Sequence, residues 1–303
     1  MPRTDRSTAV SENRYPRSFH VVVSLSAVLC LTASPVFADT GEGAGFESYT
    51  ALGDSFTSGP LIPPQAPGAD PRCLRSSVNY PNLVADALGV AEFTDASCSG
   101  AVIADLSGPQ YTEFADVPAQ FDALDTGTDL VTIGIGGNDL GFSEVFAECA
   151  KRSLRNPLGN PCEDHYGDEL DRRVEALRGR VAGVYAEVGE RSPGAVVVGV
   201  GYLQILPESR GCWPTAPIAW GDVSYLDGVQ TAFNRMLEEE ARAAGAVFVD
   251  VFERGHDVCA PASERWVEGL VPENAAAPVH PNEAGMAAVS ERVLAELGAG
   301  VRV

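Results

Sequence analysis

A serine with the surroundings of a nucleophile follows the first apolar run of the mature chain, within Gly53-Asp54-Ser55-Phe56. The preceding residues, Tyr49-Thr50-Ala51-Leu52, are short, apolar and β-prone, which is typical of a buried strand. In an open parallel sheet, ligands bind at the carboxyl ends of the strands, which is where Ser55 would stand. The same tripeptide is also common in turns and at helix N-caps, so alone it does not assign chemistry.

A serine nucleophile needs a general base, and histidine titrates nearest to neutral pH. Three histidines follow residue 38, namely His165, His256 and His280. His280 stands directly before Pro281 and a predicted helix, and the proline restricts the backbone at the entry to that helix. All three remain candidates on sequence alone, because nucleophile and base meet in space and not in sequence.

Donors for a developing oxyanion are the third requirement. The run Gly134-Ile135-Gly136-Gly137-Asn138-Asp139 follows the third predicted strand, and Asn138 can present its side-chain amide there. The run Ser97-Cys98-Ser99-Gly100-Ala101 follows the second and exposes the N–H of Gly100. A dinucleotide-binding turn is excluded, because that fingerprint follows the first strand and opens a helix. Asp54 and Asp139 are interpreted as residues that hold their own turns.

The elements that position these residues alternate between apolar runs and amphipathic segments. The runs predicted as strands are 49–52, 92–94, 130–135, 195–200 and 246–251. The segments predicted as helices are 81–88, 117–124, 169–190, 226–244 and 283–297. This order predicts an α/β fold, a three-layer α/β/α sandwich around a central, mostly parallel five-stranded sheet. Two proline-rich segments, 61–80 and 203–222, are expected to form walls of a binding site at the strand ends.

The N-terminal residues have the pattern of an export signal. Four arginines precede a short apolar stretch, and Val36-Phe37-Ala38 resembles a cleavage site, which predicts a signal peptide over residues 1–38 and a mature domain over residues 39–303. A membrane anchor is excluded because the apolar stretch is too short. The net charge is −21, and −23 without the predicted signal, which disfavours nucleic acid and anionic bilayers as partners.

The even number of cysteines in the mature chain predicts three disulfides in an exported protein. The six are Cys73, Cys98, Cys149, Cys162, Cys212 and Cys259. Cys149 and Cys162 are close in sequence and are expected to pair locally, whereas the other pairings stay open from the count. A metal site is disfavoured because the histidines are scattered and no Cys-x-x-Cys pair occurs.

Taken together, these blocks resemble the SGNH (GDSL) hydrolase family over essentially the whole mature chain, and in particular its secreted actinobacterial lipases and esterases with three disulfides. The matching blocks are Gly53-Asp54-Ser55, Gly100, Gly137-Asn138-Asp139 and His280-Pro281. The resemblance implies a flavodoxin-like SGNH hydrolase fold, Ser55 as nucleophile and His280 as general base. It also implies an oxyanion hole formed by the N–H groups of Ser55 and Gly100 and the side chain of Asn138. By analogy the disulfides are Cys73–Cys98, Cys149–Cys162 and Cys212–Cys259.

One departure from the family pattern concerns the group that orients the base. Many members carry an aspartate three residues before the histidine, where this chain has Ala277. Some secreted members are similar in using a backbone carbonyl instead, so we predict that the carbonyl of Ala277 accepts the Nδ1–H of His280. Glu273 or Asp257 folding back onto the ring is the alternative. A carbonyl can fix the tautomer, but it stabilises the imidazolium less than a carboxylate does.

The sequence therefore predicts a secreted serine ester hydrolase, a lipase or carboxylesterase that forms an acyl-enzyme at Ser55 with His280 as base. The alternatives are a phospholipase A or a polysaccharide acetylesterase at the same site, or a non-catalytic secreted binding protein. The expected partner is a small-molecule or lipid ester. No cofactor, metal, nucleic acid or integral membrane contact is expected, and the expected state is a monomer.

Overall fold

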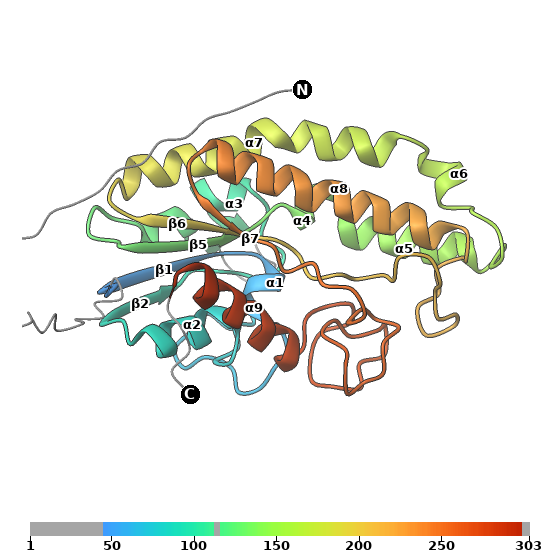
Figure 1. Ribbon diagram of the computed structural model, residues 1–303, viewed down its shortest axis with the longest axis horizontal. Helices are drawn as coiled ribbons and strands as arrows, with labels where there is room; N and C mark the ends of the chain where they lie inside the picture. Colours follow the sequence, from blue (N-terminus) through green and yellow to red (C-terminus); the bar gives the residue numbers. More distant parts are fainter. Residues whose placement is uncertain (1–44, 112–115, 299–303) are drawn as a thin grey trace, which may run out of the picture. The chain divides into compact units, whose positions relative to one another are not determined.

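Five parallel strands form the central sheet, in the order β2-β1-β5-β6-β7 (Figure 1). They are β1 (Ser48–Gly53), β2 (Glu92–Asp95), β5 (Leu130–Gly134), β6 (Val196–Val200) and β7 (Val247–Val249). The computed structural model describes residues 45–111 and 116–298. The predicted signal peptide, residues 1–38, and its cleavage after Ala38 lie outside the described residues. All five predicted strands are present, and the predicted sheet is confirmed.

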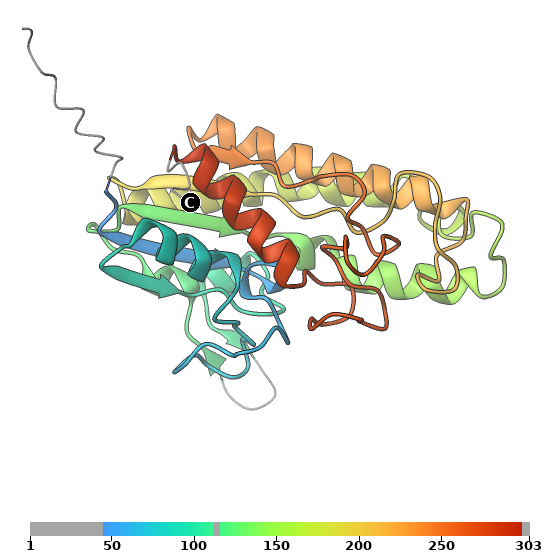
Figure 2. The same cartoon turned by 60° about the horizontal axis from the view of Figure 1, so that its bottom comes forward.

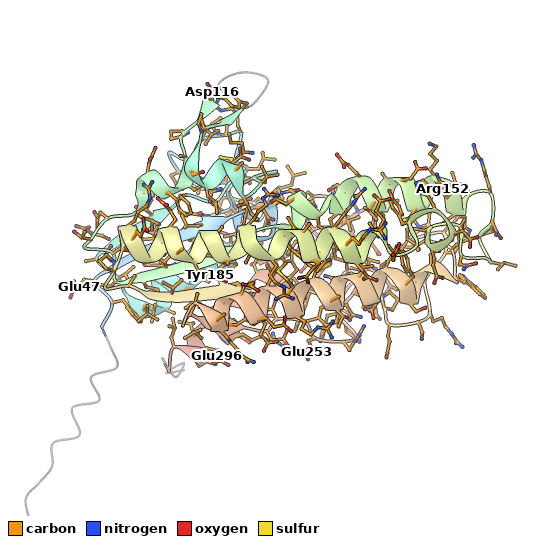
Figure 3. The ribbon with its side chains drawn as sticks, turned by 90° about the horizontal axis from the view of Figure 1, so that it is seen from above. Glu47, Asp116, Arg152, Tyr185, Glu253 and Glu296 are labelled. Atoms are coloured by element: carbon orange, nitrogen blue, oxygen red, sulfur yellow. A yellow bond between two sulfur atoms is a disulfide. The ribbon has the colours of Figure 1, made fainter. Side chains whose placement is uncertain are left out.

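Helices cover both faces of this sheet. On one face α7 (Glu169–Arg191) and α8 (Asp222–Ala243) lie side by side, as Figure 3 shows from above. On the other face α2 (Tyr80–Leu88) packs against α9 (Glu283–Glu296). The helix α7 buries an apolar stripe with helical spacing, which includes Leu170, Val174, Leu177, Val181, Val184 and Val188. The three-layer α/β/α architecture is therefore confirmed.

Short elements connect these layers. They are α1 (Ser55–Ser58), α3 (Ala104–Ser107), β3 (Gln110–Tyr111), β4 (Asp116–Val117), η1 (Gln120–Ala123), α4 (Gly137–Leu140), α5 (Phe142–Ser153) and α6 (Glu163–Tyr166). The strands β3 and β4 form an antiparallel pair at the bottom of Figure 2.

The largest differences from the sequence prediction concern two helices. The prediction of a helix over 117–124 is wrong. Val117 belongs to strand β4 and pairs with Gln110 of β3, and only the 3₁₀ turn η1 follows. Pro118 also disfavours the helical conformation at the residue before it, Val117. The helix α5 is missing from the predicted elements, although Val145, Phe146 and Cys149 form a buried face.

The three disulfides are Cys73–Cys98, Cys149–Cys162 and Cys212–Cys259. The pairing that the resemblance implied is thus confirmed. The first joins the proline-rich segment 61–80 to the turn that follows β2, and the third joins the segments that follow β6 and β7. Within the described residues, none of the helices combines the length and the apolar character needed to cross a bilayer.

Candidate active site

Ser55 is the first residue of α1 and follows β1 after only Asp54. Such an abrupt strand-to-helix turn requires glycine at position 53, because a Cβ there would lie 2.7 Å from the carbonyl oxygen of Gly134 and 2.2 Å from Thr57 Oγ1. The carboxylate of Asp54 accepts the N–H of Phe56 at 2.9 Å and so caps the short helix. The hydroxyl of Ser55 is thereby presented at the carboxyl edge of the sheet.

His280 meets Ser55, although the two residues are 225 positions apart in the sequence. Its Nε2 lies 2.9 Å from Ser55 Oγ, and its Nδ1 lies 2.7 Å from the carbonyl oxygen of Pro278. A carbonyl can only accept, so Nδ1 carries the proton and Nε2 of the neutral ring is free to accept one from Ser55. Burial lowers the pKa of His280, and the hydrogen bond to Pro278 offsets this only in part. The ring is thus uncharged at neutral pH.

The prediction that the Ala277 carbonyl orients the ring is wrong by one residue. The carbonyl of Ala277 accepts the backbone N–H of His280 at 3.2 Å, which closes a four-residue turn. Pro278 occupies the second position of that turn, and Val279 the third with φ of +59°, so the turn is of type II. In this geometry the central carbonyl, that of Pro278, is the one that reaches the imidazole.

The two carboxylates considered as alternatives have other partners. Asp257 accepts the N–H of Cys259 at 2.8 Å, and Glu273 accepts a hydrogen bond from Arg265 at 3.2 Å. His256, another candidate base, stacks on Trp266 with the ring centroids 3.8 Å apart. Ser55 and His280 are therefore joined without a carboxylate on Nδ1.

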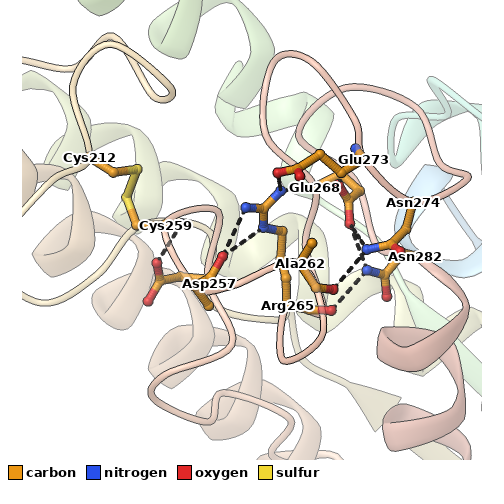
Figure 4. A network of polar contacts seen from close by, with 10 residues as sticks. Cys212, Asp257, Cys259, Ala262, Arg265, Glu268, Glu273, Asn274 and Asn282 are labelled. Atoms are coloured by element: carbon orange, nitrogen blue, oxygen red, sulfur yellow. Dashed lines mark hydrogen bonds and ion pairs between the residues drawn. A yellow bond between two sulfur atoms is a disulfide. The ribbon is translucent and has the colours of Figure 1, made fainter.

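A buried carboxylate holds the segment that carries His280 (Figure 4). Glu268 is fully buried and accepts hydrogen bonds from Asn274 Nδ2 and Asn282 Nδ2, both at 2.8 Å. Burial acts to raise the pKa of Glu268, but these hydrogen bonds outweigh it and hold the pKa below the usual value. The N–H of Glu268 also donates to the carbonyl of His280 at 2.9 Å. The base is thus fixed through its own backbone and through Asn282, the N-cap of α9.

Of the three predicted oxyanion donors, Ser55 and Asn138 line one cavity, whereas Gly100 is not among the residues that line it. Among the described residues, the N–H groups of Ser55 and Gly100 have no hydrogen-bond partner. The side chain of Asn138 lines the same cavity as Ser55 and donates one amide hydrogen to the carbonyl of Ala101 at 2.9 Å, leaving the other for a ligand. Gly100 lies between Ala101 and Ser99, whose hydroxyl is 2.9 Å from that of Ser58 on α1.

Tyr202 is a site residue that the sequence reasoning missed. Its buried hydroxyl accepts the N–H of Gly137 at 2.9 Å and donates to the carboxylate of Asp54. It therefore connects the turn that carries Ser55 to the turn that carries Asn138. Its position in the sequence could have identified it. Tyr202 lies two residues after the end of β6, so it is at the carboxyl edge of the sheet, where Ser55 also lies.

Of the two acidic residues predicted to hold their own turns, Asp54 does so through the N–H of Phe56, whereas Asp139 contacts residues of other segments. Burial raises the pKa of Asp54 to about 7, against the lowering effect of the hydrogen bonds from Tyr202 and Phe56. Asp139 accepts the N–H of Ile103 at 2.9 Å and pairs with Arg180. Burial raises the pKa of Asp139 as well.

The cavity at Ser55 has a volume of about 390 Å³ and a mostly apolar lining. Its apolar wall comes mainly from α5, with further residues from the segment after β6 and the segment after β7: Phe142, Phe146, Ala147, Ala150, Ile205, Leu270 and Val279. The expectation for the proline-rich segments is therefore mostly wrong, since 61–80 contributes no lining residue and 203–222 contributes Ile205. Among the described residues, no cluster of three His, Cys, Asp or Glu side chains could hold a metal ion.

Known proteins resemble this chain over most of its length. The model of the GDSL-like lipase/acylhydrolase family matches residues 51–288. Lipase 2 of Streptomyces coelicolor is 37% identical over 281 residues, which are 89% of this chain and 92% of that protein. The phospholipase A1 of Streptomyces albidoflavus matches in structure with a TM-score of 0.67 at 28% identity, covering 84% of this chain and 99% of that one.

The extracellular lipase of Streptomyces rimosus matches in structure with a TM-score of 0.66 at 25% identity, again over 84% of this chain and 99% of the relative. The range that the family model matches includes Ser55, Asn138 and His280. On this match, the chain belongs to the GDSL-like lipase/acylhydrolase family and is a carboxylic ester hydrolase.

Proposed function

We propose that this protein is a secreted lipase or carboxylesterase that works through a Ser55–His280 dyad. The observation that carries the proposal is the 2.9 Å contact between Ser55 Oγ and His280 Nε2, at the mouth of an apolar cavity. Secretion is supported by the predicted signal peptide and by the three disulfides. The extracellular lipase of S. rimosus is consistent with this location.

In the proposed reaction, His280 Nε2 takes the proton of Ser55 as Oγ attacks the ester carbonyl. Negative charge then develops on the carbonyl oxygen, where the N–H groups of Ser55 and Gly100 and the amide of Asn138 would donate to it. The imidazolium returns the proton to the leaving alcohol, and an acyl-enzyme remains. Water attacks that ester with His280 again as base. Throughout, the Pro278 carbonyl keeps the proton on Nδ1 and the ring in place.

The acyl group of the proposed substrate is an aliphatic chain. An acetyl group would leave most of the 390 Å³ cavity empty, whereas an alkyl chain could lie along the α5 wall formed by Phe142, Phe146, Ala147 and Ala150. This favours a lipase or phospholipase A over a polysaccharide acetylesterase. Phospholipid cleavage is the second candidate, because the structural relative from S. albidoflavus is a phospholipase A1.

The decisive test replaces the nucleophile and compares it with a second serine of the same cavity. Ser55→Ala should abolish hydrolysis of p-nitrophenyl esters and labelling by a fluorophosphonate. Ser143→Ala removes a hydroxyl from the same cavity without touching His280 and should retain both. Hydrolysis or labelling that survives in Ser55→Ala would refute the proposal.

A substrate series then separates the candidate substrates. For the proposed lipase, kcat/KM rises from acetyl to medium-chain esters, because each methylene placed along the α5 wall contributes about 0.8 kcal/mol. A maximum at acetyl would indicate an acetylesterase instead. Release of fatty acid from phosphatidylcholine vesicles, at rates comparable to those on simple esters, would indicate a phospholipase A.

A further inference from the structure

The Gly100 donor lies in a turn that has two alternative forms. The N–H of Ala101 donates to the carbonyl of Cys98 at 3.1 Å, which closes a four-residue turn. Gly100, in the third position, has φ of +81°, whereas Ser99 is not among the residues with positive φ, so the turn is of type II. A type I turn uses the same closing hydrogen bond, but its central peptide is turned over. The direction of the Gly100 N–H therefore depends on which form the turn adopts.

The side chain of Gln110 contacts the central peptide of this turn. Its Nε2 donates to the carbonyl of Ser99 at 2.9 Å. The C=O of Ser99 and the N–H of Gly100 belong to one trans peptide and point in opposite directions. A hydrogen bond that holds the carbonyl on one side therefore holds the N–H on the other. Donation to the carbonyl also polarises the peptide, which makes its N–H a better donor.

The amide oxygen of Gln110 makes no hydrogen bond comparable to that of its Nε2. Its Oε1 is buried and has no hydrogen-bond partner among the described residues, which is costly for a glutamine. Gln110 is located in β3, where its backbone pairs with Val117, and it does not line the cavity that contains Ser55. The contact between Gln110 and Ser99 is thus the polar interaction that the side chain makes at this position.

The two other proposed donors, the Ser55 N–H and the Asn138 amide, are also held by hydrogen bonds to groups other than the ligand. The carbonyl of Asp54, in the same peptide as the Ser55 N–H, accepts the N–H of Ser58 at 2.9 Å. The amide of Asn138 is held by the carbonyl of Ala101. For Gly100, the corresponding contact comes from a side chain distant from the reacting atoms, and it can be removed alone.

We propose that Gln110 is a positioning residue, which holds the Cys98–Ala101 turn in the form that directs the Gly100 N–H toward the oxyanion. This inference rests on the proposed function, since it concerns a group that acts in ester hydrolysis. Gln110 itself touches neither the substrate nor the reacting atoms. Its effect should therefore appear in the transition state and not in the binding of the ester.

The test is Gln110→Met, which keeps the length of the side chain and removes the donor together with the unpartnered oxygen. Loss of one hydrogen bond should reduce kcat by about 3- to 10-fold, below the roughly 10²- to 10³-fold cost of losing an oxyanion donor entirely. KM should stay within about twofold, and the Kd of an alkylboronic acid should rise by the same factor as kcat falls. The Tm should not fall, because a buried unpartnered oxygen has been removed.

Gln65→Met is the matched control. Gln65 Nε2 also donates to a backbone carbonyl, that of Ile62 at 3.2 Å, but neither residue lines the cavity that contains Ser55. This variant should match wild type in kcat and in boronate affinity. Gln110→Met is also tested in a Gly100→Ala variant. A Cβ at position 100 has room, since its nearest neighbour is Gln110 Nε2 at 3.7 Å, but alanine disfavours the positive φ of this position. In that background Gln110→Met should change kcat by less than about twofold, because both changes act on the same turn.

The possible failures are distinguishable. If Gln110→Met matches Gln65→Met in kcat and boronate affinity, the inference about Gln110 is wrong while the dyad stands. If Gln110→Met lowers the Tm and leaves kcat unchanged, the side chain is only structural. If Ser55→Ala still hydrolyses esters, the proposed function itself fails, whatever Gln110 does.

Discussion

The Tyr202 hydroxyl connects the nucleophile to the Asn138 turn, so Tyr202→Phe is the most informative substitution in the site. The change removes one oxygen and leaves the ring contacts, including that with Phe56 at a centroid distance of 5.1 Å. It leaves the N–H of Gly137 without its partner and removes a hydrogen bond to Asp54. We expect lower stability, and a lower kcat because the Asn138 turn is no longer held at its distance from Ser55.

The size of the stability loss depends on pH through Asp54. The unpartnered N–H costs about 1–3 kcal/mol at any pH. The pKa of Asp54 is raised from 3.8 to about 7 in the folded protein, so the buried carboxyl is neutral at about pH 5 and ionised at about pH 8.5. A hydrogen bond to the neutral acid contributes about 1 kcal/mol, and one to the carboxylate about 1.5–3 kcal/mol. The total loss should thus be about 2–4 kcal/mol at about pH 5 and about 1 kcal/mol larger at about pH 8.5.

The sign follows from linkage. A folded pKa above the unfolded one means that Asp54 lowers stability progressively as pH rises from about 4 to about 7. Without the Tyr202 hydrogen bond that pKa rises further, and this loss of stability becomes larger. The variant and the wild type should therefore diverge as pH increases through neutrality.

Urea unfolding with disulfides intact, followed by tryptophan fluorescence at both pH values, measures this difference. Tyr185→Phe is the matched control: Tyr185 is a buried tyrosine of α7 (Figure 3), and its hydroxyl makes no hydrogen bond to any described residue. The control should lose little stability, with no dependence on pH. If Tyr202→Phe behaves like Tyr185→Phe, or if its loss does not change with pH, the assigned hydrogen bonds are wrong.

Three further predictions concern the base and the nucleophile turn. Because burial lowers the pKa of His280, the acid limb of kcat/KM should have its midpoint below about 6.5; a midpoint above that value would contradict the buried, uncharged ring. Glu273→Gln and Asp257→Asn should leave kcat within about twofold, since neither carboxylate contacts His280, and a drop of about 10²-fold in either would identify the missing third member of a triad. Gly53→Ala should lower the free energy of unfolding by about 1–3 kcal/mol and reduce kcat, because its Cβ would collide with the backbone of Gly134; full activity and stability would show that the turn can relax.

Local signals in the sequence were sufficient for most of the fold. The apolar runs of β1, β5 and β6 and the long stripe of α7 are periodic enough to be recognised without tertiary context. The helix predicted over 117–124 failed because Val117 pairs with Gln110, a partner on another strand. Helix α5 was missed although four of its apolar residues line the cavity. A prediction from local pattern cannot weigh such contacts.

The sequence by itself determined the fold class and the residue types for an acyl transfer, because strand periodicity and short motifs are local properties. Ser55 and His280 could be singled out in this way, although they are 225 residues apart. Only the tertiary structure decided how they are held. The type II turn selects the carbonyl of Pro278 over that of Ala277, and Tyr202, Glu268 and Gln110 orient the site from separate segments. Orientation depends on where distant backbone and side-chain groups meet, and spacing along the chain does not record that.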